Sequence, residues 1–130
     1  MFLIDSSLWI EYLRPKGSKT IKARVREALQ REEALTCGIV IVELLRGARV
    51  EKDYLDLQDS MFSLPMVLMD EPVFERAARW GFELDRKGKL VSTTDLLIAS
   101  AAHQQVTVLH NDSDFELIAS ELPLDQERII

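Results

Sequence analysis

The sequence has 130 residues, of which 47% are hydrophobic and 29% charged, and a formal net charge of −6. This length and composition favour one globular domain, residues 1–130, with a substantial core. A single cysteine, Cys37, excludes an internal disulfide and a cluster of zinc-binding thiolates, and its apolar surroundings predict a core residue. No apolar run approaches the roughly 20 residues that a membrane span needs, and Met1 is not followed by a basic secretion segment, so we expect a cytoplasmic protein.

The negative net charge argues against nucleic-acid binding at first sight, because neutralisation of phosphates dominates such binding. The charges are segregated, however. Between residues 14 and 31 the only acid is Glu27, and the segment carries seven basic residues: Arg14, Lys16, Lys19, Lys22, Arg24, Arg26 and Arg31. This pattern is typical of a solvated helix face, and it is also compatible with a surface that binds nucleic acid.

The first half of the chain alternates short apolar runs with helical patterns. Residues 2–4 are too few and too apolar for an amphipathic helix, and they lead into capping residues, so we expect a buried strand followed by a helix that ends near Leu13. The other elements expected in this half are a helix over about 18–33, a strand over 34–37, and helices over about 38–49 and 52–61.

The second half continues the alternation. The apolar run 66–69 is predicted as a third strand, and the longest helix follows it to about residue 87, opened by an acidic turn with a proline. A nearly all-apolar helix, which residues 92–95 start, is expected over 96–104 and must be central. A clear strand over 106–109, a short helix to Ser120 and a possible edge strand in the tail 122–130 complete the chain. Strands that alternate with helices predict a parallel sheet covered on both faces.

The run Ile39–Leu45 organises the chain, because it is apolar except for Glu43 at its centre. A buried ionised carboxylate costs several kcal/mol unless it is paired or bound to a cation, so Glu43 needs a partner. Arg46, one helical turn away, is a local candidate. The alternative is a metal shared with four acids that each lie beside an apolar segment: Asp5, Asp95, Asp112 and Asp114.

These acids are expected at one edge of the sheet. Ligands of open α/β sheets bind at the carboxyl ends of the strands, and Asp5 and two later aspartates directly follow predicted strands. Asp95 opens a helix, where a carboxylate also stabilises the helix dipole by about 0.3–1 kcal/mol. Oxygen ligands favour Mg²⁺ or Mn²⁺ over zinc. His110 is close enough in sequence to be a ligand, but the site does not need it.

Four stretches that appear in order across nearly the whole chain resemble the acidic motifs of the PIN-domain nucleases. They are Leu3–Ile10 with Asp5, Glu43–Gly47, Thr94–Ala99 with Asp95, and His110–Phe115 with Asp112 and Asp114. No single stretch is specific, but the four together are. The resemblance implies a PIN-like three-layer α/β/α sandwich with a central, mainly parallel sheet. Single-domain PIN proteins of this size most resemble VapC-type toxins of type II toxin–antitoxin systems.

The resemblance also implies a function. It is that of a Mg²⁺- or Mn²⁺-dependent endoribonuclease toxin that forms a homodimer and is inhibited, in a hetero-oligomer, by a VapB-type antitoxin. The expected catalytic acids are Asp5, Glu43, Asp95 and Asp114; Asp112 is an accessory metal ligand or the alternative fourth acid. Supporting hydroxyls are expected from Ser7 and Thr94, and contacts to the RNA backbone from Arg14, Lys16 and Arg46.

Two other classes of protein share some of these features. A phosphoacceptor receiver domain has a similar size and an acidic magnesium pocket, and Asp70 follows a predicted strand as its acceptor would. The lysine that such a pocket requires after the last strand is missing from His110–Asp112. A non-catalytic PIN scaffold that only binds partners is the other alternative, and the complete acidic set disfavours it.

An apolar group near the Glu43 helix indicates where a partner could bind. Its members lie on one predicted helix and its exit: Tyr54, Leu55, Leu57, Met61, Phe62 and Leu64. Methionine and aromatic surfaces suit an amphipathic helix laid in a groove. Our hypothesis is that an antitoxin segment docks there and sends a basic side chain towards the acidic pocket.

Overall fold

The four strands form one sheet in which all neighbours run parallel. The computed structural model describes residues 1–130. The strands are β1 (Phe2–Ile4), β2 (Ala34–Leu35), β3 (Thr107–His110) and β4 (Gln126–Arg128), in the order β2-β1-β3-β4. Leu3 is in register with Val108 of β3, so the carboxyl ends of β1 and β3 lie next to each other.

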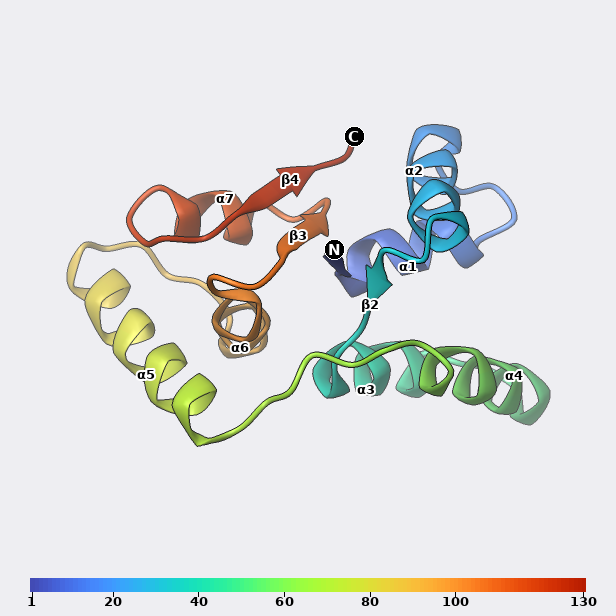
Figure 1. Cartoon of the computed structure of the whole chain (residues 1–130), viewed down its shortest axis with the longest axis horizontal. Helices are drawn as coiled ribbons and strands as arrows, with labels where there is room; N and C mark the ends of the chain where they lie inside the picture. The colour runs from blue at the N-terminus through green and yellow to red at the C-terminus, as the bar shows by residue number, and fades with distance from the viewer.

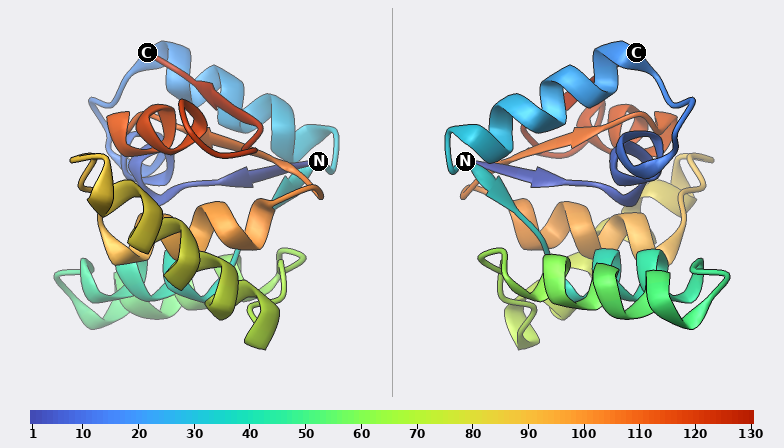
Figure 2. Two further views of the ribbon diagram at one scale, coloured as in Figure 1. Left: turned by 90° about the vertical axis from the view of Figure 1, so that its left-hand side faces the viewer. Right: turned by 90° about the vertical axis from the view of Figure 1, so that its right-hand side faces the viewer.

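Seven helices surround the sheet (Figure 1). They are α1 (Ser6–Leu13), α2 (Lys19–Gln30), α3 (Gly38–Arg46), α4 (Glu51–Phe62), α5 (Glu71–Arg86), α6 (Thr93–Ala102) and α7 (Ser113–Ala119). Figure 2 shows α2 on one side of the sheet and α6 on the other, with α5 packed outside α6. The helix α3 contacts α1, α4 and α6. The predicted three-layer α/β/α sandwich is therefore confirmed, and its sheet is wholly parallel.

The core follows from strands that are apolar along their whole length. The side chains of Leu3, Ile4, Val108 and Leu109 are fully buried, as a parallel sheet covered on both faces requires. Burying one such side chain contributes about 1.5–3 kcal/mol. The apolar helix α6 is buried along most of its length and is central, as expected. Cys37 is fully buried, which confirms it as a core residue.

The third strand predicted over residues 66–69 is wrong. Only Met66 pairs, in an isolated bridge with Thr36, and Val67 is the one buried residue of the run. The reason is that β2 ends at Leu35 and α3 begins at Gly38, so the run has almost no strand beside it. Its apolar composition reflects one buried side chain and two exposed ones, Met66 and Leu68.

The C-terminal end of α3 differs from the prediction, whereas the strand predicted in the tail is present. The helix α3 ends at Arg46 and not near Arg49, and Gly47, a poor helix former, follows it. The edge strand expected in the tail is confirmed as β4, which pairs with β3.

None of the seven helices has both the length and the apolar character needed to cross a membrane.

Candidate active site

The structure brings all five predicted acids to one end of the sheet. Asp5 follows β1, and Asp112 and Asp114 follow β3, so the parallel pairing of these strands sets their ends together. Asp95 lies in the first turn of α6, and Glu43 lies on α3, which contacts α6. Asp114 clusters with Asp95 and Asp112, and the negative charge of Asp112 also acts on Asp5 and Glu43, so the five groups share one neighbourhood.

Asp5 is held by α1 and keeps one oxygen unpaired. The residue is 3% exposed, and its Oδ2 accepts hydrogen bonds from the Ser7 backbone N–H (3.1 Å) and hydroxyl (2.6 Å). The Ser7 hydroxyl oxygen accepts a hydrogen bond from the backbone N–H of Asn111 at 3.0 Å, which joins α1 to the turn after β3. The other carboxylate oxygen, Oδ1, is buried without a hydrogen-bond partner. A bound cation would satisfy this atom.

Asp95, Asp112 and Asp114 form a tight cluster. One carboxylate oxygen from each lies within 4.8 Å of the other two. Ser92 holds two of these acids, because its backbone N–H donates to Asp114 Oδ2 (3.0 Å) and its hydroxyl accepts from the Asp95 backbone N–H (3.1 Å). Asp112 Oδ1 accepts a hydrogen bond from the Asp114 N–H at 2.9 Å. These hydrogen bonds hold the carboxylates of Asp112 and Asp114 and the main chain of Asp95.

Glu43 is half-buried, which corrects the expectation of a carboxylate enclosed in an apolar run. Its neighbour Val42 is 61% exposed, so this face of α3 reaches the surface. The Ser6 hydroxyl donates a hydrogen bond to Glu43 Oε1 at 3.3 Å. None of the ion pairs in the structure involves Glu43, so the local pair with Arg46 does not form.

The shared neighbourhood disfavours full ionisation of the acids. Burial raises the pKa of Asp95 to about 8, helped by its hydrogen bond with Asp114 and by the charges of Asp112 and Asp5. Burial also raises the pKa of Asp5, although the hydrogen bonds from Ser7 oppose this. The pKa of Glu43 is raised by burial and then by the charge of Asp5. The site therefore concentrates more negative charge than the protein itself compensates.

This donor set fits a hard divalent cation. Every candidate ligand atom is a carboxylate oxygen, the type that Mg²⁺ and Mn²⁺ prefer. His110 is not available as a ligand, because both ring nitrogens are engaged: the Asp112 backbone N–H donates to Nδ1 (3.1 Å), and Nε2 lies 2.6 Å from Gln126 Oε1. A cation held by these acids would relieve their mutual repulsion and could bind a phosphate.

Some supporting residues differ from expectation. Thr94 is exposed, and its hydroxyl lies 3.2 Å from the Ser92 hydroxyl and makes no hydrogen bond with an acid. Ser92 takes the supporting role, and its position three residues before Asp95 is the spacing of a helix-capping pair, a signal that could have identified it. No comparable local signal marks Ser6 or Asn111.

Basic side chains without an internal partner gather in one part of the chain. Of the 16 lysines and arginines, five make no ion pair or hydrogen bond within the protein: Lys16, Lys19, Arg26, Arg46 and Arg49. The loop after α1 and the loop after α3 lie at the same end of the molecule as the carboxyl ends of the strands (Figure 2). Of the residues predicted to bind RNA, Lys16 and Arg46 are unpaired, and Arg14 has an exposed pairing with Glu11 at 3.7 Å.

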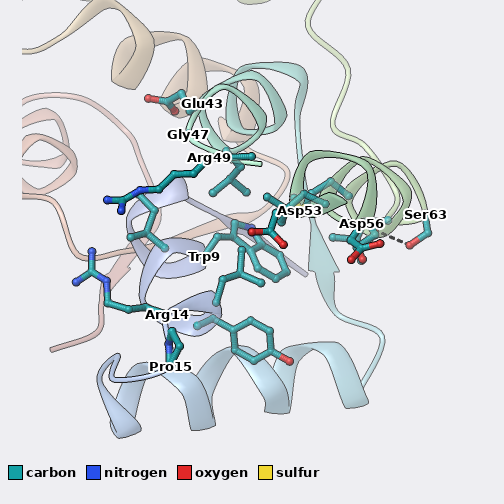
Figure 3. Close-up of a pocket in the computed structure, with 18 of the residues that line it drawn as sticks. Trp9, Arg14, Pro15, Glu43, Gly47, Arg49, Asp53, Asp56 and Ser63 are labelled. Carbon is teal, nitrogen blue, oxygen red and sulfur yellow. Dashed lines mark hydrogen bonds between the residues drawn. The ribbon is translucent and has the colours of Figure 1, made fainter. Parts of the chain in front are cut away.

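A groove of about 1010 Å³ begins at Glu43 and runs between α1 and α4 (Figure 3). Trp9 lies between the two helices, and the guanidinium groups of Arg14 and Arg49 extend to the same side. Two acids of α4 lie on the groove lining, Asp53 and Asp56. The groove therefore reaches the acidic site at Glu43.

Three of the six apolar residues that were predicted as a partner surface line this groove. Leu57, Met61 and Leu64 line the groove. The other three predicted residues do not line it and are exposed: Tyr54 (38%), Leu55 (47%) and Phe62 (56%). By the helical period, Leu55 and Phe62 lie off the face of Leu57 and Met61, whereas Tyr54, three residues before Leu57, lies beside that face without lining the groove.

Comparison with known proteins identifies the family. A family model described as the PIN domain matches residues 2–121. Ribonuclease VapC11 from Mycobacterium tuberculosis is 35% identical over 124 residues, which cover 92% of both chains. A VapC ribonuclease from Mycobacterium bovis matches with the same identity and coverage.

Solved structures share the fold. The crystal structure of FitAcB from Neisseria gonorrhoeae superposes with a TM-score of 0.79 at 22% identity, over 97% of this chain and 96% of that one. DNA-bound VapBC from Salmonella typhimurium gives 0.78 at 22% identity, over 98% and 96%. At these identities the structures establish the fold, and the family model and the VapC relatives establish the rest: this chain belongs to the PIN-domain family and is of the VapC type.

Proposed function

We propose that this chain is a metal-dependent endoribonuclease that acts as the toxin of a toxin–antitoxin pair. The convergence of five carboxylates, which the protein's own cations do not neutralise, carries the proposal. The relatives named as VapC ribonucleases support RNA as the substrate. A protein that cleaves cellular RNA works in the cytoplasm, where we place this chain.

The acids would hold the cation and the fold would keep them in place. When bound, a divalent cation polarises the scissile phosphate and lowers the pKa of the water that attacks it. Asp5 offers the unpaired Oδ1 to the cation, while Ser7 fixes the orientation of that carboxylate. Glu43, which lines the groove and accepts a hydrogen bond from Ser6, would hold the cation directly or through water.

Asp112 takes a larger part in this proposal than an accessory ligand. Burial is the largest cause of the raised pKa of Asp5, Glu43 and Asp95, and the charge of Asp112 adds to it at all three, whereas Asp114 acts on Asp95 alone, through a hydrogen bond. Asp112 is therefore the more central of the two acids that follow β3. We propose that both hold the cation, with Asp114 fixed against Ser92.

RNA would approach between the two basic loops at the acidic end of the sheet. Arg14 and Lys16 follow α1, and Arg46 ends α3. Because Lys16 and Arg46 have no internal acidic partner, binding a phosphate costs them no existing ion pair. These cations would hold the RNA backbone while the carboxylates hold the metal.

Metal exchange tests the proposed activity. RNA cleavage by the purified protein is expected to stop in EDTA and to return with Mg²⁺ or Mn²⁺. Ca²⁺ is not expected to restore it, because its larger and more flexible coordination shell holds the site loosely. Cleavage is measured on a labelled RNA by gel electrophoresis. Cleavage that persists in EDTA would contradict a metal-dependent site.

The groove beside Glu43 is the proposed binding site of a VapB-type antitoxin segment. An amphipathic helix or strand could place apolar side chains between α1 and α4 and a basic side chain at Glu43, where the acidic site begins. The partner would then compete with the metal by charge.

We also propose a homodimer, which three exposed apolar side chains on α5 and the following loop would stabilise: Phe74 (51%), Phe82 (45%) and Leu90 (74%).

A pair of substitutions on α4 tests the groove. Leu57→Glu places a charge inside it and is expected to weaken binding of the co-expressed neighbouring gene product by about 30-fold or more, the loss typical of an interface hot spot. Leu55→Glu makes the same substitution on the same helix, at an exposed position off the groove face, and is the matched control. Affinities are measured by calorimetry, and relief of growth arrest by co-expression.

The outcome separates two claims. Equal binding by Leu57→Glu and the wild type would place the partner elsewhere. If no neighbouring gene product binds and overproduction leaves growth unaffected, the toxin assignment fails even if RNA cleavage is observed.

A further inference from the structure

The C-terminal strand β4 and the residue after it contact the segment that leads to the acids at three points. The backbone N–H of Ile129 donates to the His110 carbonyl oxygen at 2.8 Å. The Arg128 guanidinium donates through Nε to Asn111 Oδ1 at 3.2 Å. The third contact joins side chains, because His110 Nε2 lies 2.6 Å from Gln126 Oε1. The turn after β3 is thus tied to the edge of the sheet.

The His110 ring connects this strand to the metal-binding turn. The side chain is fully buried and packs on Phe115 with ring centroids 4.9 Å apart. The Asp112 backbone N–H, which can only donate, lies 3.1 Å from Nδ1, so Nδ1 carries no hydrogen. The hydrogen is then on Nε2, which donates it to Gln126 Oε1. The contacts on both sides of the ring select one tautomer.

We propose that His110 and Gln126 are positioning residues for the metal site. Through them, β4 helps to hold Asp112 and Asp114 in the orientation that binds metal. His110 holds the Asp112 main chain, and the Asp112 side chain in turn holds the Asp114 N–H. The assignment of metal to these acids rests on the proposed function. The family model ends at residue 121, before β4, so the family match does not include this connection.

Three substitutions test the hydrogen bonds that link Gln126 through His110 to Asp112. The Asp112 N–H bonds to a side-chain acceptor two residues earlier, the geometry that an asparagine oxygen also adopts in an Asx-turn. His110→Asn can therefore keep the bond to Asp112, whereas His110→Leu removes it. Gln126→Leu leaves the ring without its acceptor on β4.

The measurement is Mn²⁺ affinity by calorimetry without RNA. Loss of a residue that orients a metal ligand typically weakens binding by about 10–100-fold, which is expected for His110→Leu and Gln126→Leu. His110→Asn is expected to recover part of the loss. His103→Leu is the matched control, because its ring is half-buried and bonded to the Pro123 carbonyl, away from the acids. Wild-type Mn²⁺ affinity in His110→Leu would overturn the proposal.

Spectroscopy on the unaltered protein tests the same connection without a variant that could fail to fold. A long-range ¹H–¹⁵N spectrum is expected to show His110 with its hydrogen on Nε2 and none on Nδ1. A hydrogen on Nδ1 would remove the bond to Asp112 and overturn the proposal. This readout needs neither metal nor RNA, so it stands if the protein fails to cleave RNA, a result that would count against the proposed function alone.

Discussion

Asp5→Asn is expected to cleave RNA at least about 1,000-fold more slowly than the wild type, a loss of about 4 kcal/mol of transition-state stabilisation. The substitution removes the charge that Oδ1 offers to the cation. An asparagine oxygen can still accept the two hydrogen bonds from Ser7, so α1 keeps its cap. Initial cleavage rates are measured at saturating Mg²⁺, with circular dichroism to show that the variant is folded.

Asp70→Asn is the matched control for this substitution. Asp70 is exposed and precedes α5, and its side chain makes no capping hydrogen bond. In a phosphoacceptor receiver domain it would be the essential acid, but the segment before it is not a strand, which removes the placement that this alternative needs. Cleavage should therefore be unchanged in Asp70→Asn. Cleavage lost in Asp70→Asn and kept in Asp5→Asn would contradict the proposed site.

The sequence was sufficient to predict the meeting of the acids, because that meeting depends on local patterns. Short apolar runs that end in acids identified β1 and β3, and parallel strands necessarily bring their carboxyl ends together. The helical periodicity of the sequence predicted the bounds of α1 to α7 to within a few residues. The run 66–69 has the same composition as a strand, but composition does not show whether a neighbouring strand is long enough to pair with it.

Other features depend on contacts between distant residues and leave no local pattern. His110 and Gln126 are 16 positions apart, and Asn111 meets Ser7 across 104 positions. The half-exposure of Glu43 depends on which face of α3 the other helices leave open. The residues of α4 that line the groove likewise depend on how α4 is rotated against α1. Such details follow from packing and are not encoded in any one segment.

Asp95→Asn is expected to stabilise the metal-free protein, increasingly so as the pH rises from about 4 to about 8. The pKa of Asp95 is raised from 3.8 to about 8 in the folded chain, first by burial. Between these values the folded state binds a proton that the unfolded state has released, so the wild type loses stability as the pH rises. Asparagine never ionises and escapes this loss.

Thermal unfolding in EDTA at several pH values measures the effect. Near pH 8 the free energy of unfolding of the variant should exceed that of the wild type by at least about 1.4 kcal/mol, the equivalent of one pKa unit. Near pH 4 the difference should be small. Asp59→Asn, on the exposed surface of α4, corrects for the change in net charge. A difference that does not grow with pH would mean that Asp95 is ionised in the folded protein without cost.

Addition of metal should reverse the order of stability. A cation that binds only the folded state stabilises it by about 2.7 kcal/mol at 100 times its dissociation constant, and the wild type retains the full set of acids to bind it. Asp95→Asn, which lacks one of the three clustered carboxylates, should gain less from Mn²⁺. Asp95 would then destabilise the metal-free protein and stabilise the metal-bound protein, because a bound cation removes the repulsion among the carboxylates.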